Sequence, residues 1–139
     1  MRPARRLVTI DDERGKSRAL ADGPAPEVIW ATDRTPARIT TQLPSVPRSF
    51  EPPPGGSVCR ILDFPPDAGR KAPMRKSRTL DFCLVLEGEI TLVLDLEEVQ
   101  LRAGDVVVQR GTRHTWSNRS ARPCRIAISS HDATEAPSS

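Results

Sequence analysis

The sequence has 139 residues, which is enough for one domain with a single core and too short for two. Its formal net charge of +3 is unevenly distributed, because residues 1–80 carry 15 Lys and Arg against 9 Asp and Glu, whereas residues 81–139 carry 6 against 9. The basic segment from Arg70 to Arg78 has no aromatic residues between its cations and no nucleic-acid motif beside it. We therefore expect no nucleic-acid partner.

The cysteines and the N-terminus bear on the cellular compartment. Cys59, Cys83 and Cys124 are odd in number and none forms a CxxC pair, which argues against a disulfide framework and against a cysteine zinc site. No apolar run follows the arginines at the N-terminus, and no segment approaches the roughly 18 apolar residues that a membrane helix needs. We predict a cytoplasmic protein with reduced thiols and no membrane contact.

The first half of the chain alternates short β-like runs with turn clusters such as Asp22–Pro24. The segment Pro44–Gly56 contains five prolines and two glycines and cannot form a helix, because proline lacks the amide donor and clashes with the preceding turn. We expect an ordered loop or linker there. The strands predicted before it are Arg6–Ile10, Glu27–Ala31 and Arg38–Leu43.

The second half has a denser pattern of apolar and β-branched runs. Turn residues at Gly88–Glu89 and Ala103–Asp105 separate neighbouring runs, and no amphipathic helix of useful length interrupts them. This pattern predicts an antiparallel barrel or sandwich, followed by a polar, frayed tail from Asp132. The strands predicted here are Ser57–Phe64, Asp81–Glu87, Glu89–Asp95, Glu98–Leu101, Val106–Gln109, His114–Asn118 and Cys124–Ser129.

Two spaced motifs make the sequence similar to the cupin superfamily over roughly residues 57–130. The first motif of that family is Gly-x5-His-x-His-x3,4-Glu-x6-Gly, and the second is Gly-x5-Pro-x-Gly-x2-His-x3-Asn. The second has one residue fewer than usual between its glycines, and Gln109 stands where proline is common. The matching positions are Gly69, Arg75, Ser77, Asp81 and Gly88 for the first motif, and Gly104, Gly111, His114 and Asn118 for the second.

The resemblance implies an all-β fold, an antiparallel double-stranded β-helix or jelly-roll barrel with a Pro-rich N-terminal arm. It divides the chain into short strands and arm over residues 1–56, the barrel over 57–130 and a flexible tail over 131–139. The motif glycines suit turns that need positive φ, which glycine reaches cheaply. A Pro-rich arm that crosses to a partner barrel is common in the family, so we expect a homodimer.

The family's metal site offers three imidazoles and one carboxylate to a divalent ion. Here Arg75 is cationic and Ser77 is a poor ligand, which leaves Asp81 and His114 as weak candidate ligands. The sequence therefore predicts a barrel that does not hold a catalytic metal tightly. A divalent transition metal is the alternative that this reading keeps open.

The predicted catalytic residues are His114, Asp81 and Arg75. Histidine titrates near neutral pH and suits general acid–base chemistry. Asp81 would orient the histidine or share the proton transfer with it. Arg75 would bind a carboxylate or enolate oxygen of the ligand. The alternative is a histidine kept by descent and an arginine that points to solvent or pairs with Asp81. The predicted ligand-binding residues are Ser77, Cys83, Gln109, Trp116 and Asn118. The alternatives are ordinary packing or a satisfied amide for Trp116 and Gln109, and a small buried apolar role for Cys83.

Strand alternation puts Asp81, Cys83 and Val85 on one face of their strand, and His114, Trp116 and Asn118 on one face of theirs. The resemblance implies that these faces line the barrel interior. The leading hypothesis is a small-molecule enzyme, an isomerase, dehydratase, cyclase or decarboxylase acting on a small organic acid or polyketide-like carbonyl compound. The alternatives are a non-catalytic small-molecule binding barrel and a weakly metal-dependent oxygenase or isomerase. The fold cannot choose among them.

Overall fold

The computed structural model describes residues 1–44 and 49–136. This part of the chain forms strands and connecting loops and contains no helix, so it has no helix that could cross a membrane. The strands are β1 (Arg5–Asp11), β2 (Ser17–Pro24), β3 (Val28–Thr32), β4 (Ser57–Phe64), β5 (Arg75–Lys76), β6 (Thr79–Glu87), β7 (Glu89–Leu94), β8 (Glu98–Arg102), β9 (Val106–Arg110), β10 (Arg113–Ser117) and β11 (Cys124–Asp132).

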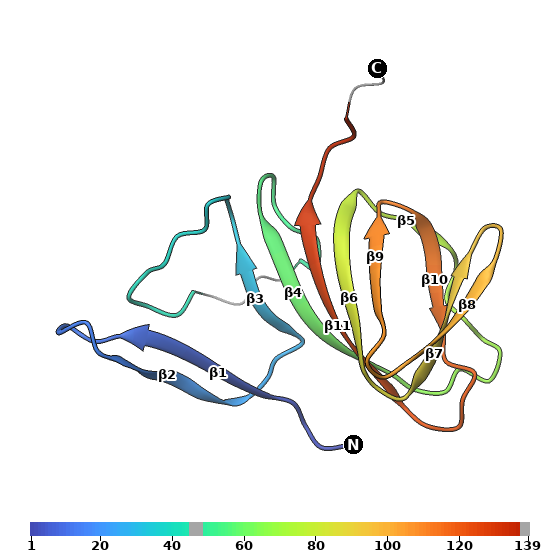
Figure 1. The fold of residues 1–139 in the computed structure, drawn as a ribbon, viewed down its shortest axis with the longest axis horizontal. Coiled ribbons are helices and arrows are strands. Elements are labelled where there is room, and N and C mark those ends of the chain that lie inside the picture. The colour runs from blue at the N-terminus through green and yellow to red at the C-terminus, as the bar shows by residue number, and fades with distance from the viewer. Residues whose placement is uncertain (45–48, 137–139) are drawn as a thin grey trace.

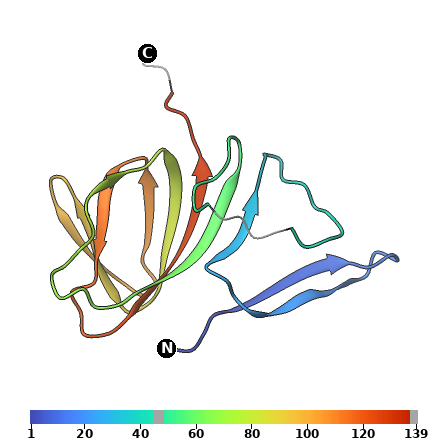
Figure 2. The same ribbon diagram turned by 180° about the vertical axis from the view of Figure 1, so that it is seen from behind.

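The strands are paired antiparallel in three sheets. A five-stranded sheet has the order β3-β4-β11-β6-β9, and a four-stranded sheet has the order β5-β10-β7-β8. The two sheets face each other and form the barrel, while the hairpin β1-β2 extends away from it (Figure 1). The view from behind in Figure 2 shows the same separation of hairpin and barrel. The predicted all-β barrel is confirmed.

Glycines shape the turns of the barrel. Gly69, Gly88, Gly104 and Gly111, the four glycines of the two motifs, all have positive φ. At Gly88 a Cβ atom would lie 2.6 Å from the backbone oxygen of Pro123, so a side chain there would also collide with a neighbouring loop. The spacing of the motif glycines in the sequence therefore matches the positions where the turns need a positive φ.

The apolar core fills one end of the barrel interior. Its buried members come from β6, β7 and β11, and partly buried side chains from both sheets pack against them. Alternation along β6 and β11 explains this, since every second residue of each strand is buried. The core consists of Cys83, Val85, Ile90, Cys124, Ile126 and Ile128, with Leu62, Phe64, Leu101, Val107 and Trp116 packed against it.

The first half of the chain differs from the prediction. The segment Arg38–Leu43 is not a strand; its Ile39 is 97% exposed, and the segment pairs with no strand in residues 1–44 and 49–136. Instead Ser17–Pro24 pairs with β1. The hairpin turn lies before it, where the Asp12 carboxylate accepts hydrogen bonds from the backbone amides of Arg14 and Lys16.

The ends of the barrel also differ slightly. The short strand β5 was missed, because two basic residues carry no strand signal of their own. Strand β11 continues to Asp132, so it includes two residues that the prediction assigned to the flexible tail. Backbone pairing of Ser130 with Val58 and of His131 with Ser57 explains the longer strand. Part of the predicted Pro-rich segment, residues 45–48, lies outside the described residues, and its role as an arm stays a prediction.

Candidate functional site

A row of side chains, three of its four members polar, crosses the five-stranded sheet on the face that lines the barrel; it is called the polar row below. Residues directly opposite each other in antiparallel strands point to the same face, so the register identifies complete rows. This row consists of Val58, Ser130, Asp81 and Gln109, from β4, β11, β6 and β9. All four are buried. The row lies at the end of the barrel where β11 leads to the C-terminus, the upper end in Figure 1.

The adjoining row contains a cation that the sequence analysis missed. It consists of Arg60, Ile128, Cys83 and Val107. Ile128 and Cys83 belong to the core, so Arg60 shares a face with buried apolar residues. The alternation in Ser57–Phe64 could have revealed this, because Val58, Arg60, Leu62 and Phe64 all fall on the same face of that strand.

The opposite sheet adds the remaining predicted catalytic residues. Arg75 and His114 are direct partners across β5 and β10, and His114 is also the partner of Leu94 on β7. Trp116 lies two residues further along β10 and packs against the core, with its ring 6.0 Å from the His114 ring. His114 therefore lies on the interior face together with Trp116, and Arg75 lies beside it on the short edge strand, where it is exposed.

Hydrogen bonds orient His114 and Gln109. The Nδ1 atom of His114 lies 2.9 Å from the backbone oxygen of Thr112, and since a carbonyl only accepts, Nδ1 is the donor. Nε2 of the neutral ring is then left with its lone pair free for proton transfer. The Thr112 hydroxyl in turn donates to Oε1 of Gln109. One residue thus fixes both side chains, the imidazole from its backbone and the amide from its hydroxyl.

Four buried polar atoms near this end of the barrel have no hydrogen-bond partner within the described chain. They are Nε of Arg60, Oγ of Ser77, Oδ1 of Asp81 and Nε2 of Gln109. A buried polar atom without a partner costs about 1–3 kcal/mol, so proteins keep few of them. Their concentration in this region marks it as the candidate site.

The donor set at the family's metal positions does not fit a tightly bound metal ion. Arg75 is a cation and the direct partner of His114, so it would repel a metal held by that imidazole. Ser77 offers only a weak hydroxyl ligand. In residues 1–44 and 49–136 no group of three or more His, Cys, Asp or Glu side chains is placed to hold a metal. We therefore derive no step of the chemistry through a metal.

Cys83 and Trp116 serve the core. Burial raises the pKa of the Cys83 thiol to about 12, and the negative charge of Asp81 adds to this. The thiol is therefore protonated at neutral pH, which makes it a poor nucleophile. Trp116 packs on the core cluster and lies near the Phe64 ring, with ring centroids 6.4 Å apart. Both residues border the polar end and form its apolar wall.

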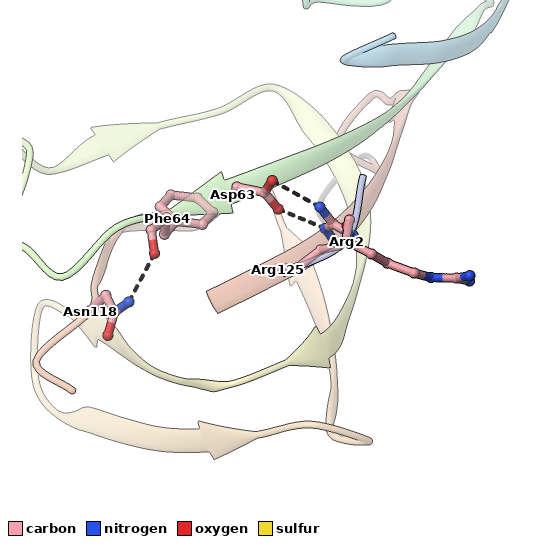
Figure 3. Close-up of polar contacts among 5 residues, drawn as sticks. All are labelled: Arg2, Asp63, Phe64, Asn118 and Arg125. Atoms are coloured by element: carbon pink, nitrogen blue, oxygen red, sulfur yellow. Dashed lines mark hydrogen bonds and ion pairs between the residues drawn. The ribbon is translucent and has the colours of Figure 1, made fainter. Parts of the chain in front are cut away.

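Both side-chain polar atoms of Asn118 form hydrogen bonds within the protein. Its Nδ2 donates to the backbone oxygens of Phe64 and Arg122, each at 2.8 Å, and its Oδ1 accepts from the amide and hydroxyl of Ser120. The bond to Phe64 is drawn in Figure 3. These bonds fix the loop between β10 and β11 and leave no free donor for a ligand, so we leave Asn118 out of the proposed site.

An ion pair near the other end of the barrel ties β11 to β4. Arg125 donates two hydrogen bonds to the Asp63 carboxylate, at 2.7 and 3.0 Å (Figure 3), and a third to the backbone oxygen of Arg2. The Arg125 side chain is only 11% exposed. The bonded guanidinium lowers the pKa of Asp63 below its usual value. This pair anchors the N-terminus to the barrel, far from the polar row.

A pocket of about 830 Å³ lies at the same end as the polar row. Residues 79–80 and 110–111 border it, and these flank Asp81 and Gln109 in sequence. Its charged residues are Lys76, Arg78 and Arg110 against Glu135. The approach to this end of the barrel is therefore basic.

The sequence matches the family description "Cupin domain" over residues 60–130. It is 39% identical over 140 aligned residues to "Phomopsin biosynthesis cluster protein C'" of Diaporthe leptostromiformis, covering 86% of this chain and 73% of that protein. It is 38% identical to "Cupin-domain-containing oxidoreductase virC" of Hypocrea virens, where it covers 75% of this chain and spans about half (53%) of the relative.

Solved structures agree on the fold. A "Cupin 2 conserved barrel domain protein" from Salinispora arenicola superposes with a TM-score of 0.51 over 66% of this chain and 71% of that chain, at 22% identity. At that identity the likeness concerns the fold alone. The match over residues 60–130 and the similarity to the phomopsin cluster protein complete the identification: this chain belongs to the cupin family.

Proposed function

We propose that this cupin is a small-molecule enzyme that uses acid–base chemistry at the polar end of its barrel. The relatives support a role in small-molecule chemistry, since one is named for a phomopsin biosynthesis cluster and another for an oryzines biosynthesis cluster. The proposed substrate is a small organic acid or polyketide-like carbonyl compound. The proposed reaction is an isomerisation, dehydration, cyclisation or decarboxylation.

The observation that carries the proposal is the orientation of His114 beside unpaired interior polar atoms. Because Nδ1 donates to Thr112, Nε2 is the atom that accepts a proton. In the proposed step Nε2 removes a proton from the carbon next to a carbonyl group, and the C–H electron pair moves into the carbonyl to form an enolate. Arg75, the partner of His114, stabilises the enolate oxygen.

Asp81 completes the set as a second proton acceptor. Its buried carboxylate has one oxygen without a partner, so it is available to a substrate without first breaking a bond to the protein. The enolate is then protonated by the His114 imidazolium at a different position, or it expels a leaving group that takes this proton as it departs. In a decarboxylation the C–C bond to the carboxylate breaks in place of the C–H bond, CO2 leaves, and a protonated His114 gives its proton to the enolate carbon. None of these outcomes needs an oxidant or a reductant.

Some relatives carry the word oxidoreductase in their names, and our proposal assigns this chain a different reaction class. The choice rests on its own residues. Arg75 and Ser77 stand at two of the four positions that the family uses for metal ligands, and cationic and hydroxyl side chains favour binding of anions and carbonyl oxygens over binding of a redox metal.

The test is exchange of substrate hydrogen with solvent. Candidate carbonyl acids are incubated in D2O with the protein and EDTA, and NMR follows the loss of the hydrogen next to the carbonyl. We expect exchange with the wild type and a loss of about 100-fold or more with His114→Ala and with Asp81→Asn, since acid–base groups contribute about this much. Equal exchange in wild type and His114→Ala excludes the mechanism.

A non-catalytic binding barrel is the second candidate. It is favoured by the buried unpaired polar atoms, which a bound ligand would satisfy whether or not it reacts. Binding without exchange in the D2O experiment would select this candidate over the enzyme.

We also propose that the chain forms a homodimer through the outer face of the five-stranded sheet. Phe82 and Leu84 on β6 are direct partners of Val108 and Val106 on β9, so these side chains form one patch. Each is 41–67% exposed, and Leu86 extends the patch at 45%. A contiguous exposed apolar patch of this kind is typical of interfaces, and a second copy offers the same surface.

The three cysteines are free thiols in the described chain, which fits a reducing compartment. We propose that the protein is cytoplasmic. Fractionation of its source cells would test this directly.

A further inference from the structure

Arg60 is a cation in the barrel interior that no acidic side chain compensates. Its Nε is buried and has no hydrogen-bond partner, and Arg60 forms no ion pair within the described residues. By contrast, Arg125 on the neighbouring strand is bound to Asp63 by two hydrogen bonds. Arg60 as a whole is half-buried, but a buried guanidinium N–H without an acceptor costs free energy, and an unsatisfied group of this kind in a native protein calls for an explanation.

The surroundings of Arg60 give its guanidinium a fixed place. Its central carbon lies 5.2 Å from the centre of the Phe50 ring, in the segment that precedes β4. The ring face attracts the positive charge but offers no acceptor to Nε. The charge also acts inside the barrel, because it favours the thiolate of the buried Cys83. Arg60 is thus held at the wall of the interior with donors still free.

The charges of the interior favour an anion. Arg60 lies on an interior row of the five-stranded sheet, the exposed Arg75 lies beside His114 at the barrel edge, and Asp81 is the acidic residue of the interior rows. The pocket at this end is basic as well, with Lys76 and Arg110 at its edge. A ligand with one negative charge would balance the interior and be drawn toward it.

We propose that Arg60 binds a carboxylate of the substrate, so that the substrate is a carboxylic acid with its reacting carbonyl several bonds away. This deepens the proposed function and rests on it. Arg60 on β4 and Asp81 on β6 are separated by two strand spacings and by one row along the strands, or about 12 Å between their backbone positions. A keto acid of a few carbon atoms places its carboxylate at Arg60 and its ketone toward Asp81 and His114.

The first test uses two keto acids, levulinate and benzoylpropionate, and their methyl esters as uncharged counterparts. Binding is measured by calorimetry and by the shift in melting temperature. We expect at least one keto acid to bind the wild type and its ester to bind about 10-fold more weakly or not at all, since a charge-assisted hydrogen bond contributes about this much. Absence of binding by both acids, or equal binding of acid and ester, overturns the proposal.

The second test locates the carboxylate. Arg60→Gln should weaken binding about 10-fold or more, Arg60→Lys should retain part of it, and Arg18→Gln, which removes an exposed arginine of the hairpin, should leave it unchanged. Should Arg60→Gln fail to fold, the NMR signal of the Arg60 Nε–H group in the wild type decides. It should shift when the acid binds, and an unmoved signal contradicts the proposal.

The exchange and binding measurements distinguish failure of the acid–base enzyme from failure of carboxylate binding at Arg60. His114→Ala should keep carboxylate binding while it abolishes hydrogen exchange. Exchange that depends on His114 but proceeds equally well with methyl esters would refute the role of Arg60 and retain the acid–base enzyme. Carboxylate binding at Arg60 without any exchange would retain this inference and refute the enzyme.

Discussion

Asp81 and Gln109 are direct partners across β6 and β9, yet Oδ1 of the aspartate and Nε2 of the amide both lack a hydrogen-bond partner. When a buried donor and a buried acceptor lie on neighbouring strands but form no hydrogen bond with each other, the free energy of folding becomes less favourable. We attribute this cost to function, because such atoms are ready to bind a substrate.

The first prediction is that Asp81→Val stabilises the protein. The substitution removes a buried carboxylate with an unpaired oxygen and places a β-branched residue of similar size in a strand. We expect the free energy of unfolding in urea to rise by about 1 kcal/mol while hydrogen exchange of the substrate is lost. Asp95→Val, at an exposed aspartate, is the control and should change stability by less than about 0.5 kcal/mol. A clear loss of stability in Asp81→Val would show that its carboxylate is structurally satisfied.

The second prediction concerns Asn118. Because its side chain makes four hydrogen bonds within a buried loop, Asn118→Ala should lower the free energy of unfolding by about 2–4 kcal/mol. Carboxylate binding by the folded variant should be unchanged. Ser120→Ala removes fewer bonds and should cost about 1 kcal/mol. Loss of binding at full stability would instead return Asn118 to the ligand site.

The third prediction is a pH dependence set by Asp63. Its pKa is lowered mainly by the hydrogen bonds from Arg125, so the ionised carboxylate stabilises the folded state. This contribution is complete above the usual aspartate pKa of about 4 and is lost as the pH falls through the lowered folded value. Asp63 is 51% exposed, which limits the contribution to about 1 kcal/mol. Urea unfolding of Asp63→Asn between neutral and acidic pH should therefore lose part of the acid dependence that the wild type has. Identical pH profiles would contradict this role.

The fourth prediction tests the proposed dimer. Leu84→Arg places a charge in the middle of the exposed patch and should produce a monomer in light scattering after size exclusion. Leu96→Arg changes a 97% exposed leucine in the turn between β7 and β8 and should leave the oligomer intact. A wild type that is already monomeric at high concentration would refute the dimer.

The sequence predicted the barrel well because its strands carry strong local signals. Six of the seven strands predicted after residue 56 coincide closely with observed strands, and the motif glycines take the positive φ that the turns require. The front half was harder to predict. Arg38–Leu43 has an apolar pattern but no neighbouring strand to pair with, and pairing is a tertiary property that no local pattern contains.

The site was predicted only in part. Alternation placed Asp81 and Cys83 on the interior face correctly, because a strand has a strict period of two. Arg60 was missed because the motifs that drew attention to the site begin after it. The role of Asn118 was equally hidden, since its partners Phe64 and Arg122 are identified only once β4 and β11 are paired.

We propose that Arg75, Ser77, Asp81 and His114 stand at an acid–base site that works without a tightly bound metal. The most direct measurement is elemental analysis of the purified wild type and of His114→Ala, as isolated and after incubation with Fe, Mn, Ni and Zn followed by desalting. We expect far less than one equivalent of metal in both proteins. One equivalent in the wild type that disappears in His114→Ala would contradict this proposal and would make Asp81 and His114 metal ligands.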